Sequence, residues 1–293
     1  MSRFAYVNGQ YLPHRSASVH VEDRGYQFSD GVYEVIATVR GRLVDEEAHL
    51  DRLDRSLAAL QMRWPMSRTA LRAVLREFIR RNRLTGFGAV YLQITRGVAP
   101  RNHAFPKGVD PVLVMTAKSL PPFDMTAARR GVRVITLHDD RWRRPDIKSV
   151  SLLPNVLAKQ RAIEAGAFEA WLVDDRGLIT EGTASNAWIV TGAGELLTHS
   201  ADRAILNGIT RCAVLELAAA HGVRFVERAF GVEEAKTASE AFLTSTTSWV
   251  KPVVRIDDAL VGEGRIGPVS ERLLAYYADR VAAIGAAGAG GLG

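Results

Sequence analysis

Lysine is rare in this chain of 293 residues, which holds six lysines against 32 arginines. A lysine amine can form a stable imine with an aldehyde cofactor, and arginine cannot replace it in that reaction. Lys148 stands out because it lies in the segment 144–149, between an apolar strand and a helix of the expected fold. A loop lysine is ordinarily a solvated residue, so the rest of the chain must decide whether Lys148 does chemistry.

Two segments could hold an anion such as a phosphate. Residues 207–210 open an expected helix, where free backbone N–H groups and the helix dipole favour an anion, and Thr210 can add a hydroxyl. A simple N-cap explains this fragment equally well. Residues 244–248 offer five hydroxyls, among them those of Ser245 and Thr246, at the end of an expected strand. Threonine-rich edge strands are common, so neither segment alone identifies an anion site.

Glu181 is the candidate acid. It lies in the segment 180–186, and a carboxylate beside a pyridine nitrogen would keep that nitrogen protonated. A glutamate in a turn usually faces solvent, so Glu181 by itself proves nothing. Together with Lys148 and the two anion segments it would complete the set that pyridoxal phosphate requires: an imine-forming amine, an acid for the ring nitrogen and a phosphate site.

Hydrophobic spacing predicts the elements that must position these residues. The first part of the chain contains a hairpin around Asn8-Gly9 and a second strand pair around Gly41. Helices near 47–61 and from Ser67 to about 84 follow, then strands at 89–95 and 112–117. The later part contains strands at 132–138, 170–173, 178–180, 187–190, 240–244 and 253–256, and helices near 155–165, 208–221 and 268–283.

These blocks predict an α+β fold of two domains. Consecutive prolines make 120–123 the expected linker, so the domains are expected at 1–119 and 124–284. The Gly- and Ala-rich segment 285–293 is expected to be a disordered tail.

Composition narrows the class of protein. Hydrophobic residues make up 47% and charged residues 24%, and no apolar run approaches the roughly 20 residues that cross a bilayer. The chain starts directly in a strand and turn without a signal-peptide pattern, and its one cysteine, Cys212, fits a reducing cytoplasm. The net charge of +6 comes from arginines spread among acids, which does not favour nucleic-acid binding. We expect no metal site.

Eight segments in order resemble the fold-type IV pyridoxal-phosphate enzymes, and among these the D-amino acid transaminases. The resemblance runs from about residue 4 to residue 283, and its segments are 22–28, 30–34, 49–53, 100–103, 146–149, 181–182, 208–211 and 244–248. It implies that Lys148 holds the cofactor as an imine and moves the substrate proton, and that Glu181 pairs with the ring nitrogen. The phosphate would then be held by Arg52, Ile209, Thr210, Ser245 and Thr246.

The same resemblance implies a substrate site and a partner. Tyr33, Arg101 and His103 would bind the substrate carboxylate, and the loop of Arg101 and His103 would reach the active site of the neighbouring subunit in a homodimer. The implied reaction is a ping-pong transfer of an amino group from a D-amino acid to a 2-oxo acid. Branched-chain amino acid transaminases, (R)-selective amine transaminases and aminodeoxychorismate lyases share the fold and stay open as alternatives. Departures from the family pattern at Ala184, Asn102 and Trp249 concern the substrate range.

Overall fold

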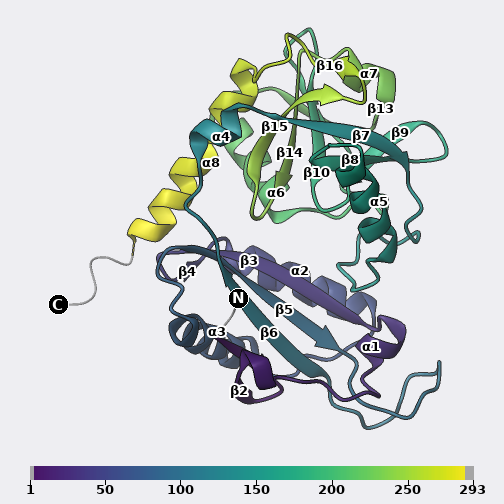
Figure 1. Cartoon of the computed structure of the whole chain (residues 1–293), viewed down its shortest axis with the longest axis vertical. Coiled ribbons are helices and arrows are strands. Elements are labelled where there is room, and N and C mark those ends of the chain that lie inside the picture. The colour runs from purple at the N-terminus through teal and green to yellow at the C-terminus, as the bar shows by residue number, and fades with distance from the viewer. Residues whose placement is uncertain (1–2, 288–293) are drawn as a thin grey trace. The chain divides into compact units, whose positions relative to one another are not determined.

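The computed structural model of the chain describes residues 3–287 (Figure 1). It divides into two compact units. The first comprises the described parts of Met1–Phe123, Ile147–Ser151 and Val281–Gly293, and the second comprises Asp124–Asp146 and Leu152–Arg280. Lys148 therefore belongs to the first unit, although it follows the proline-rich segment in the sequence. The domain boundaries expected at 1–119 and 124–284 stay a prediction.

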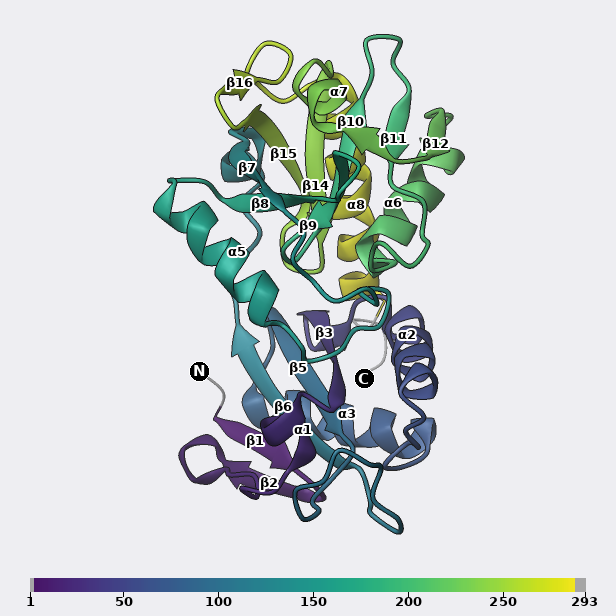
Figure 2. The ribbon, with the colours of Figure 1, turned by 90° about the vertical axis from the view of Figure 1, so that its right-hand side faces the viewer.

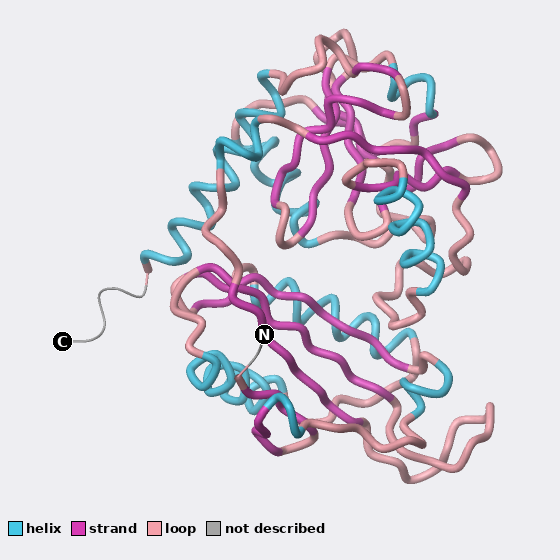
Figure 3. The backbone as a smooth tube through the Cα atoms, viewed as in Figure 1, coloured by secondary structure: helices cyan, strands magenta, loops and turns pink. Residues whose placement is uncertain are grey.

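Within the described residues, the first unit contains a six-stranded antiparallel sheet in the order β2-β1-β6-β5-β3-β4. Its strands are β1 (Phe4–Val7), β2 (Gln10–Pro13), β3 (Gly31–Val39), β4 (Arg42–Leu43), β5 (Phe87–Thr95) and β6 (Val112–Ser119). Its helical segments are η1 (His14–Ser16), α1 (Arg24–Phe28), α2 (Glu46–Ala59) and α3 (Arg68–Asn82). Helix α2 contacts β3 and α3 contacts β1, so both helices pack along the sheet (Figure 3).

Helical and strand periodicity build the core of this unit. Alternate residues of β5 point into it, and leucines three or four residues apart on α2 and α3 meet them. The buried set includes Leu50, Leu53, Leu57, Leu71, Leu75, Phe78, Val90, Leu92 and Ile94. The helices predicted from the leucine spacing are confirmed.

Local sequence signals set the ends of several elements. Asn8 and Gly9 both take positive φ angles in the β1–β2 turn, and the Ser67 hydroxyl accepts a hydrogen bond from the Ala70 N–H at 3.2 Å to cap α3, as predicted. The sequence reading missed α1. This helix begins where the Asp23 carboxylate accepts from the Gly25 N–H at 2.8 Å and ends at Ser29, which is left-handed.

The second unit contains a mixed sheet whose described strands follow the order β12-β11-β10-β14-β15-β7-β8-β9-β13, with β16 beside β15. Strand β7 runs parallel to β8 and β15, and β11 runs parallel to β12. The strands are β7 (Val132–His138), β8 (Glu169–Val173), β9 (Leu178–Gly182), β10 (Asn186–Val190), β11 (Leu196–Thr198), β12 (Phe225–Glu227), β13 (Phe230–Gly231), β14 (Glu240–Ser245), β15 (Trp249–Ile256) and β16 (Ala259–Leu260).

Helices border this sheet, and α5 lies beside β7 and β8 (Figure 2). The helices after the linker are α4 (Met125–Arg129), α5 (Leu153–Glu164), α6 (Ile209–Ala220), α7 (Val232–Lys236) and α8 (Pro268–Ala286). Trp171, Phe230 and Leu243 are among the buried residues of the core. Both units combine sheet and helix, which confirms the α+β prediction.

The tail expected at 285–293 is wrong for its first two residues. Gly285 and Ala286 belong to α8, because the alanine-rich sequence before and after Gly285 favours helix. Ala287 follows as a turn residue whose N–H donates to the Ala283 carbonyl at 3.1 Å, and residues 288–293 of that prediction lie outside the described residues. Between residues 3 and 287, no helix is long and apolar enough to cross a membrane.

Candidate active site

Lys148 is held against the beginning of β3. The Tyr33 N–H donates to the Lys148 carbonyl at 2.9 Å, and the Val150 N–H donates to the Gly31 carbonyl at 3.0 Å. This edge of β3 is available because β4 pairs only with Thr38 and Val39, at the other end of the strand. The lysine backbone is thus fixed by a sheet rather than by a mobile loop.

The Lys148 amine lies over an aromatic ring. Its Nζ is 4.3 Å from the centroid of the Tyr33 ring, and no carboxylate among residues 3–287 pairs with it. Tyr33 stacks on Tyr91 with 5.6 Å between ring centroids, and burial raises the pKa of Tyr91 to about 12. A ring face attracts an ammonium group without neutralising it. The amine is therefore available for imine formation.

Arg52 makes a bidentate ion pair with Glu34. Its Nε and Nη2 donate to the two carboxylate oxygens of Glu34 at 2.8 and 2.7 Å, and the His49 ring contacts the same carboxylate through Nδ1 at 2.7 Å. His49 and Arg52 lie three residues apart on α2 and so share one helix face. Glu34 extends from β3 and is fully buried. This geometry fixes the plane of the Arg52 guanidinium.

The charge state of this trio follows from burial and the arginine. Burial alone would raise the pKa of Glu34, but Arg52 outweighs it with help from His49, so the pKa lies well below its usual range. Burial also lowers the pKa of His49. At neutral pH the trio therefore consists of an anion, a cation and a neutral imidazole.

Arg101 and His103 are exposed residues of the loop 96–111 between β5 and β6 (Figure 1). Both contact the ring of Phe28, the last residue of α1. The Arg101 Cζ is 4.5 Å from the ring centroid and the His103 ring centroid is 5.3 Å from it. The structure thus brings Arg101 and His103 together on one ring, and separately brings Lys148 to Tyr33.

Glu181 is buried at the end of β9, whereas a turn glutamate would usually face solvent. Its Oε1 accepts from the Leu206 N–H at 3.1 Å and from Arg141 Nη1, and its Oε2 accepts from Asn186 Nδ2 at 3.0 Å. The sequence reading gave no role to Arg141 or Asn186. These contacts hold the carboxylate in one orientation.

Arg141 serves two carboxylates. It donates to Asp139 through Nε at 2.9 Å and Nη2 at 2.8 Å, in addition to its contact with Glu181. Burial raises the pKa of Glu181, and Arg141 opposes that rise. Burial would lower the pKa of Arg141, but the two carboxylates outweigh it and raise that pKa. With Glu181 ionised, the trio of Asp139, Arg141 and Glu181 carries a net charge of −1, which a protonated ring nitrogen would balance.

Asn186 links the acid to the start of α6. Besides donating to Glu181, its Nδ2 donates to the Leu206 carbonyl at 2.9 Å. A Cβ at Gly208 would lie 2.1 Å from Asn186 Oδ1, so a larger residue at this N-cap would displace the asparagine side chain. Ile209 and Thr210 are buried in the first turn, whose N–H groups have no acceptor within the helix. The predicted acid and one predicted anion segment therefore meet in the second unit.

Ser245 and Thr246 lie at the end of β14, close to the same asparagine. Asn186 on β10 pairs with Thr244 on β14, and the two hydroxyl residues follow directly. Both are half-buried. Trp249, opposite Ser245, has a φ of 56°. The second unit thus gathers Glu181, the start of α6 and the hydroxyl segment around Asn186.

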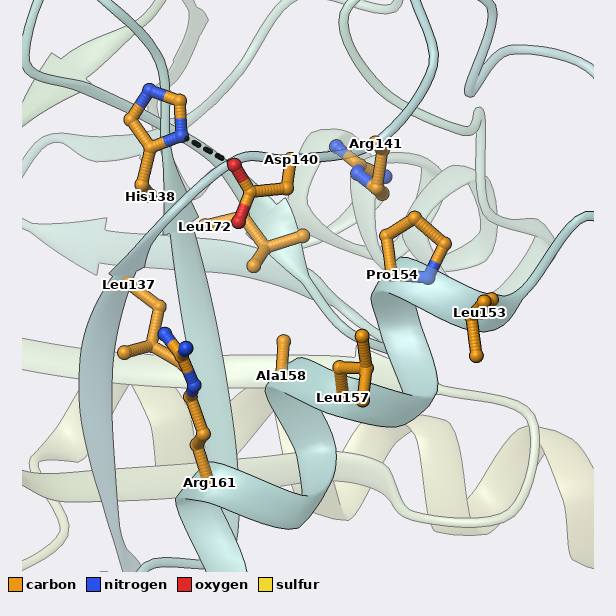
Figure 4. Close-up of a pocket in the computed structure, with 10 residues that line it drawn as sticks. All are labelled: Leu137, His138, Asp140, Arg141, Leu153, Pro154, Leu157, Ala158, Arg161 and Leu172. Atoms are coloured by element: carbon orange, nitrogen blue, oxygen red, sulfur yellow. Dashed lines mark hydrogen bonds and ion pairs between the residues drawn. The ribbon is translucent and has the colours of Figure 1, made fainter.

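These residues fit the groups of pyridoxal phosphate. The Lys148 amine has no paired carboxylate among the described residues, the trio around Glu181 carries an excess negative charge, and the first turn of α6 offers backbone donors to an anion. A pocket of about 190 Å³ lies within the second unit (Figure 4). It lies between α5 and β7, where Leu157 and Ala158 face the strand, and of the residues above it includes only Arg141.

Comparison with known proteins identifies the class. The chain matches the Amino-transferase class IV family over residues 31–256. It is 41% identical to the D-alanine aminotransferase of Staphylococcus haemolyticus over 271 residues, which cover 92% of this chain and 94% of that protein. Among solved structures, the branched-chain amino acid aminotransferase from Escherichia coli matches with a TM-score of 0.84 at 25% identity, covering 94% of this chain and 93% of that one. The 4-amino-4-deoxychorismate lyase from Pseudomonas aeruginosa matches with a TM-score of 0.80 at 27% identity, covering 94% and 98%.

The chain belongs to the class IV aminotransferases. It is an enzyme that uses pyridoxal 5′-phosphate and takes an amino acid and a 2-oxo acid as substrates. The predicted fold type, enzyme class and cofactor are confirmed. The roles assigned to individual site residues stay predictions.

Proposed function

We propose that this enzyme is a D-amino acid transaminase. It moves the amino group of a D-amino acid such as D-alanine to a 2-oxo acid such as 2-oxoglutarate, giving pyruvate and D-glutamate. The observation that carries the proposal is the 41% identity to a D-alanine aminotransferase along nearly the whole of both chains. The reaction is ping-pong because the amino group stays on the enzyme between donor and acceptor.

Lys148 is the proposed catalytic residue. Pyridoxal phosphate, when bound, supplies an electron sink for the negative charge that develops at the substrate Cα. Lys148 holds the cofactor through its amine and, once substrate has replaced that bond, carries the proton to and from Cα. The amine must be neutral for this step. The role is supported because no carboxylate among the described residues forms an ion pair with this amine.

The other cofactor contacts divide by charge. Glu181 faces the ring nitrogen and keeps it protonated, and its three donors and its burial support this role. The phosphate is assigned to a guanidinium, a helix start and two hydroxyls, namely Arg52, Ile209, Thr210, Ser245 and Thr246. Support for this assignment comes from the fixed plane of Arg52 and from the first turn of α6, whose N-cap Gly208 gives its N–H groups no side-chain acceptor.

Tyr33, Arg101 and His103 are proposed to bind the substrate carboxylate. A guanidinium fork suits a carboxylate through two parallel, charge-assisted hydrogen bonds. The common contact of Arg101 and His103 with Phe28 supports their acting together. Recognition of the carboxylate on this loop would separate D-amino acid transaminases from amine transaminases, whose substrates lack that group.

The enzyme is proposed to be a homodimer in which the loop 96–111 reaches the active site of the neighbouring subunit. Apolar side chains beside the loop support a second copy of the chain as the partner. Val21 is 72% exposed, Tyr26 76% and Phe105 54%, and the bridge between Asp23 and Val98 holds the segment of Val21 against the start of the loop. A grouped set of exposed apolar residues marks an interaction surface. We also propose a cytoplasmic location, where a single cysteine stays reduced.

A substrate panel tests the reaction. Purified enzyme is given D-alanine, L-leucine or an (R)-amine, each with 2-oxoglutarate or pyruvate, and the amino product is resolved on a chiral column. We expect D-alanine with 2-oxoglutarate to give pyruvate and D-glutamate in equal amounts. Turnover of L-leucine alone would make the enzyme a branched-chain transaminase. Release of pyruvate from aminodeoxychorismate without any oxo acid would make it a lyase.

A further inference from the structure

The loop 96–111 presents a physical problem. It spans the gap between β5 and β6 without regular secondary structure, and Arg101 and His103 are exposed on it. Such a loop would ordinarily move between conformations. Recognition of a carboxylate needs a guanidinium and an imidazole held at fixed positions. Contacts with the rest of the first unit must therefore hold the residues around Arg101 and His103 in place.

Arg24, the first residue of α1, makes that connection. Its Nη1 donates to the Asn102 carbonyl at 2.5 Å and its Nη2 approaches the His103 carbonyl at 3.4 Å. Its backbone N–H donates to the Gly97 carbonyl at 2.9 Å. Arg24 is 3% exposed, although every residue from Arg101 to His103 is exposed. One buried guanidinium therefore spans two successive carbonyls of the loop and its backbone holds the beginning of it.

Asp30 fixes the orientation of that guanidinium. Its Oδ2 accepts from Arg24 Nε at 2.8 Å and from Arg96 Nε at 2.7 Å. Because Nε is occupied by the carboxylate, the two terminal nitrogens of Arg24 point to the loop. Arg96 donates its own terminal nitrogens to the carbonyls of Leu60 and Gln61 instead. Asp30 would therefore keep an arginine partner if Arg24 were replaced.

Phe28 contacts the side chains of the loop, whereas Arg24 contacts its backbone. Arg24 and Phe28 lie four residues apart on α1 and so share one face. The Phe28 ring contacts both guanidinium groups: the Arg24 Cζ lies 4.8 Å from the ring centroid and the Arg101 Cζ lies 4.5 Å from it. The His103 ring also lies beside Phe28. Cation–π contacts of this kind orient a guanidinium while its N–H donors stay available.

We propose that Arg24 and Phe28 are positioning residues that fix the loop of Arg101 and His103 for carboxylate recognition. This inference rests on the proposed function, since it assigns the loop to substrate binding. Neither residue takes part in proton transfer. Their loss should weaken the binding of both substrates, because the amino acid and the oxo acid each bring an α-carboxylate to the same site.

The test compares four variants by steady-state kinetics with D-alanine and 2-oxoglutarate. For Arg24→Met and Phe28→Leu we expect KM for both substrates to rise about tenfold while kcat changes less than about threefold. Phe28→Tyr keeps the ring and should retain the original KM. Arg63→Met is the matched control, because Arg63 holds the other end of the same loop through Asp110 on the surface, and its KM values should not change.

A second measurement does not depend on turnover. Trypsin cleaves after Arg101 if the loop can open, so we expect Arg24→Met and Phe28→Leu to be cut at that bond at least about fivefold faster than the original enzyme, while Phe28→Tyr and Arg63→Met match it. Thermal melting and the absorbance of the bound cofactor report whether each variant is folded. If Arg24→Met fails to fold, the pair Phe28→Leu and Phe28→Tyr decides.

Arg101→Ala separates this inference from the proposed function. A raised KM in Arg101→Ala, with unchanged KM and unchanged cleavage in Arg24→Met and Phe28→Leu, would overturn the inference and leave the proposed function standing. Unchanged KM in Arg101→Ala itself would remove the carboxylate assignment, and the inference would fall with it. A raised KM in all three, with faster cleavage in the two positioning variants, supports both.

Discussion

Each unit of this enzyme contains a buried ion pair of arginine and glutamate, and the third member of each group gives the pairs opposite roles. In the first unit, Glu34 holds Arg52 and the third member is His49, which burial keeps neutral. In the second unit, Arg141 holds Glu181 and the third member is the carboxylate of Asp139. The first group has no net charge, and the second has a net charge of −1 when Glu181 is ionised.

The difference shows how one kind of contact can prepare either member for a ligand. The fully buried Glu34 orients the guanidinium of Arg52, which supports the phosphate contact that we propose for Arg52. Arg141 opposes the rise that burial causes in the pKa of Glu181 and so favours the ionised acid, which is the form that the proposed contact with a protonated ring nitrogen requires. Each supporting residue acts through its partner and is not expected to touch the substrate.

The largest effect should come from the residue outside both pairs. Lys148→Ala removes the amine that binds the cofactor and carries the proton, so we expect kcat/KM to fall by at least about 10⁴-fold. The absorbance of covalently bound cofactor should also disappear, and dialysis should then remove the cofactor. An active Lys148→Ala that keeps its yellow colour after dialysis would mean that the chemistry lies elsewhere.

Glu181→Gln should have the next largest effect and tests the second pair directly. A neutral amide cannot keep the ring nitrogen protonated, so we expect kcat to fall by about 10²-fold. Asp139→Asn is the matched variant: it leaves Arg141 wholly to Glu181 and should reduce kcat less than Glu181→Gln does. A larger loss in Asp139→Asn than in Glu181→Gln would contradict the assignment of roles within this group. Rate and cofactor spectrum are measured on the same samples.

Glu34→Gln should affect cofactor binding more than turnover. Without the carboxylate the Arg52 guanidinium loses its bidentate partner, and we expect the dissociation constant of pyridoxal phosphate to rise by about tenfold. The turnover of the saturated variant should change less than about threefold, in contrast to Glu181→Gln. Titration of the cofactor-free enzyme, followed by absorbance, gives the constant. A loss of turnover at saturating cofactor equal to that of Glu181→Gln would remove the distinction between the two pairs.

The sequence pointed to the proposed site residues more readily than to the residues that hold them in place. Lys148 and Glu181, proposed to contact the cofactor, and Arg101, proposed to bind the substrate, were singled out because motif segments surround them. Arg141 was missed because it stands with Arg143 and Arg144 in a run that looks solvated. Its pairing with Glu181, 40 residues away, depends on β7 and β9 both bordering β8, which local patterns do not reveal.

The fold shows the same limit. Periodic segments such as α2, α3 and β5 were predicted within a few residues. Short elements such as α1, α4 and α7, of five residues each, were missed because their stability comes from tertiary contacts and caps rather than from a repeating pattern. In α1 the omission matters, since this helix carries Arg24 and Phe28.

The smallest expected effect is on the pH dependence of stability, where the two glutamates should act in opposite directions. The pKa of Glu34 lies below the ordinary 4.5, so between its folded pKa and pH 4.5 the unfolded chain binds more protons and stability rises with pH. The pKa of Glu181 is raised, so above pH 4.5 the folded chain binds more protons and stability falls as pH rises. Each of the two glutamates changes the free energy of unfolding by at most about 1.4 kcal/mol per pH unit.

In the cofactor-free enzyme, Glu34→Gln should flatten the loss of stability below pH 4.5, and Glu181→Gln should flatten the loss of stability above pH 4.5. Urea unfolding at a series of pH values measures both slopes, and equal slopes in the two variants would show that the two ion pairs are electrostatically alike.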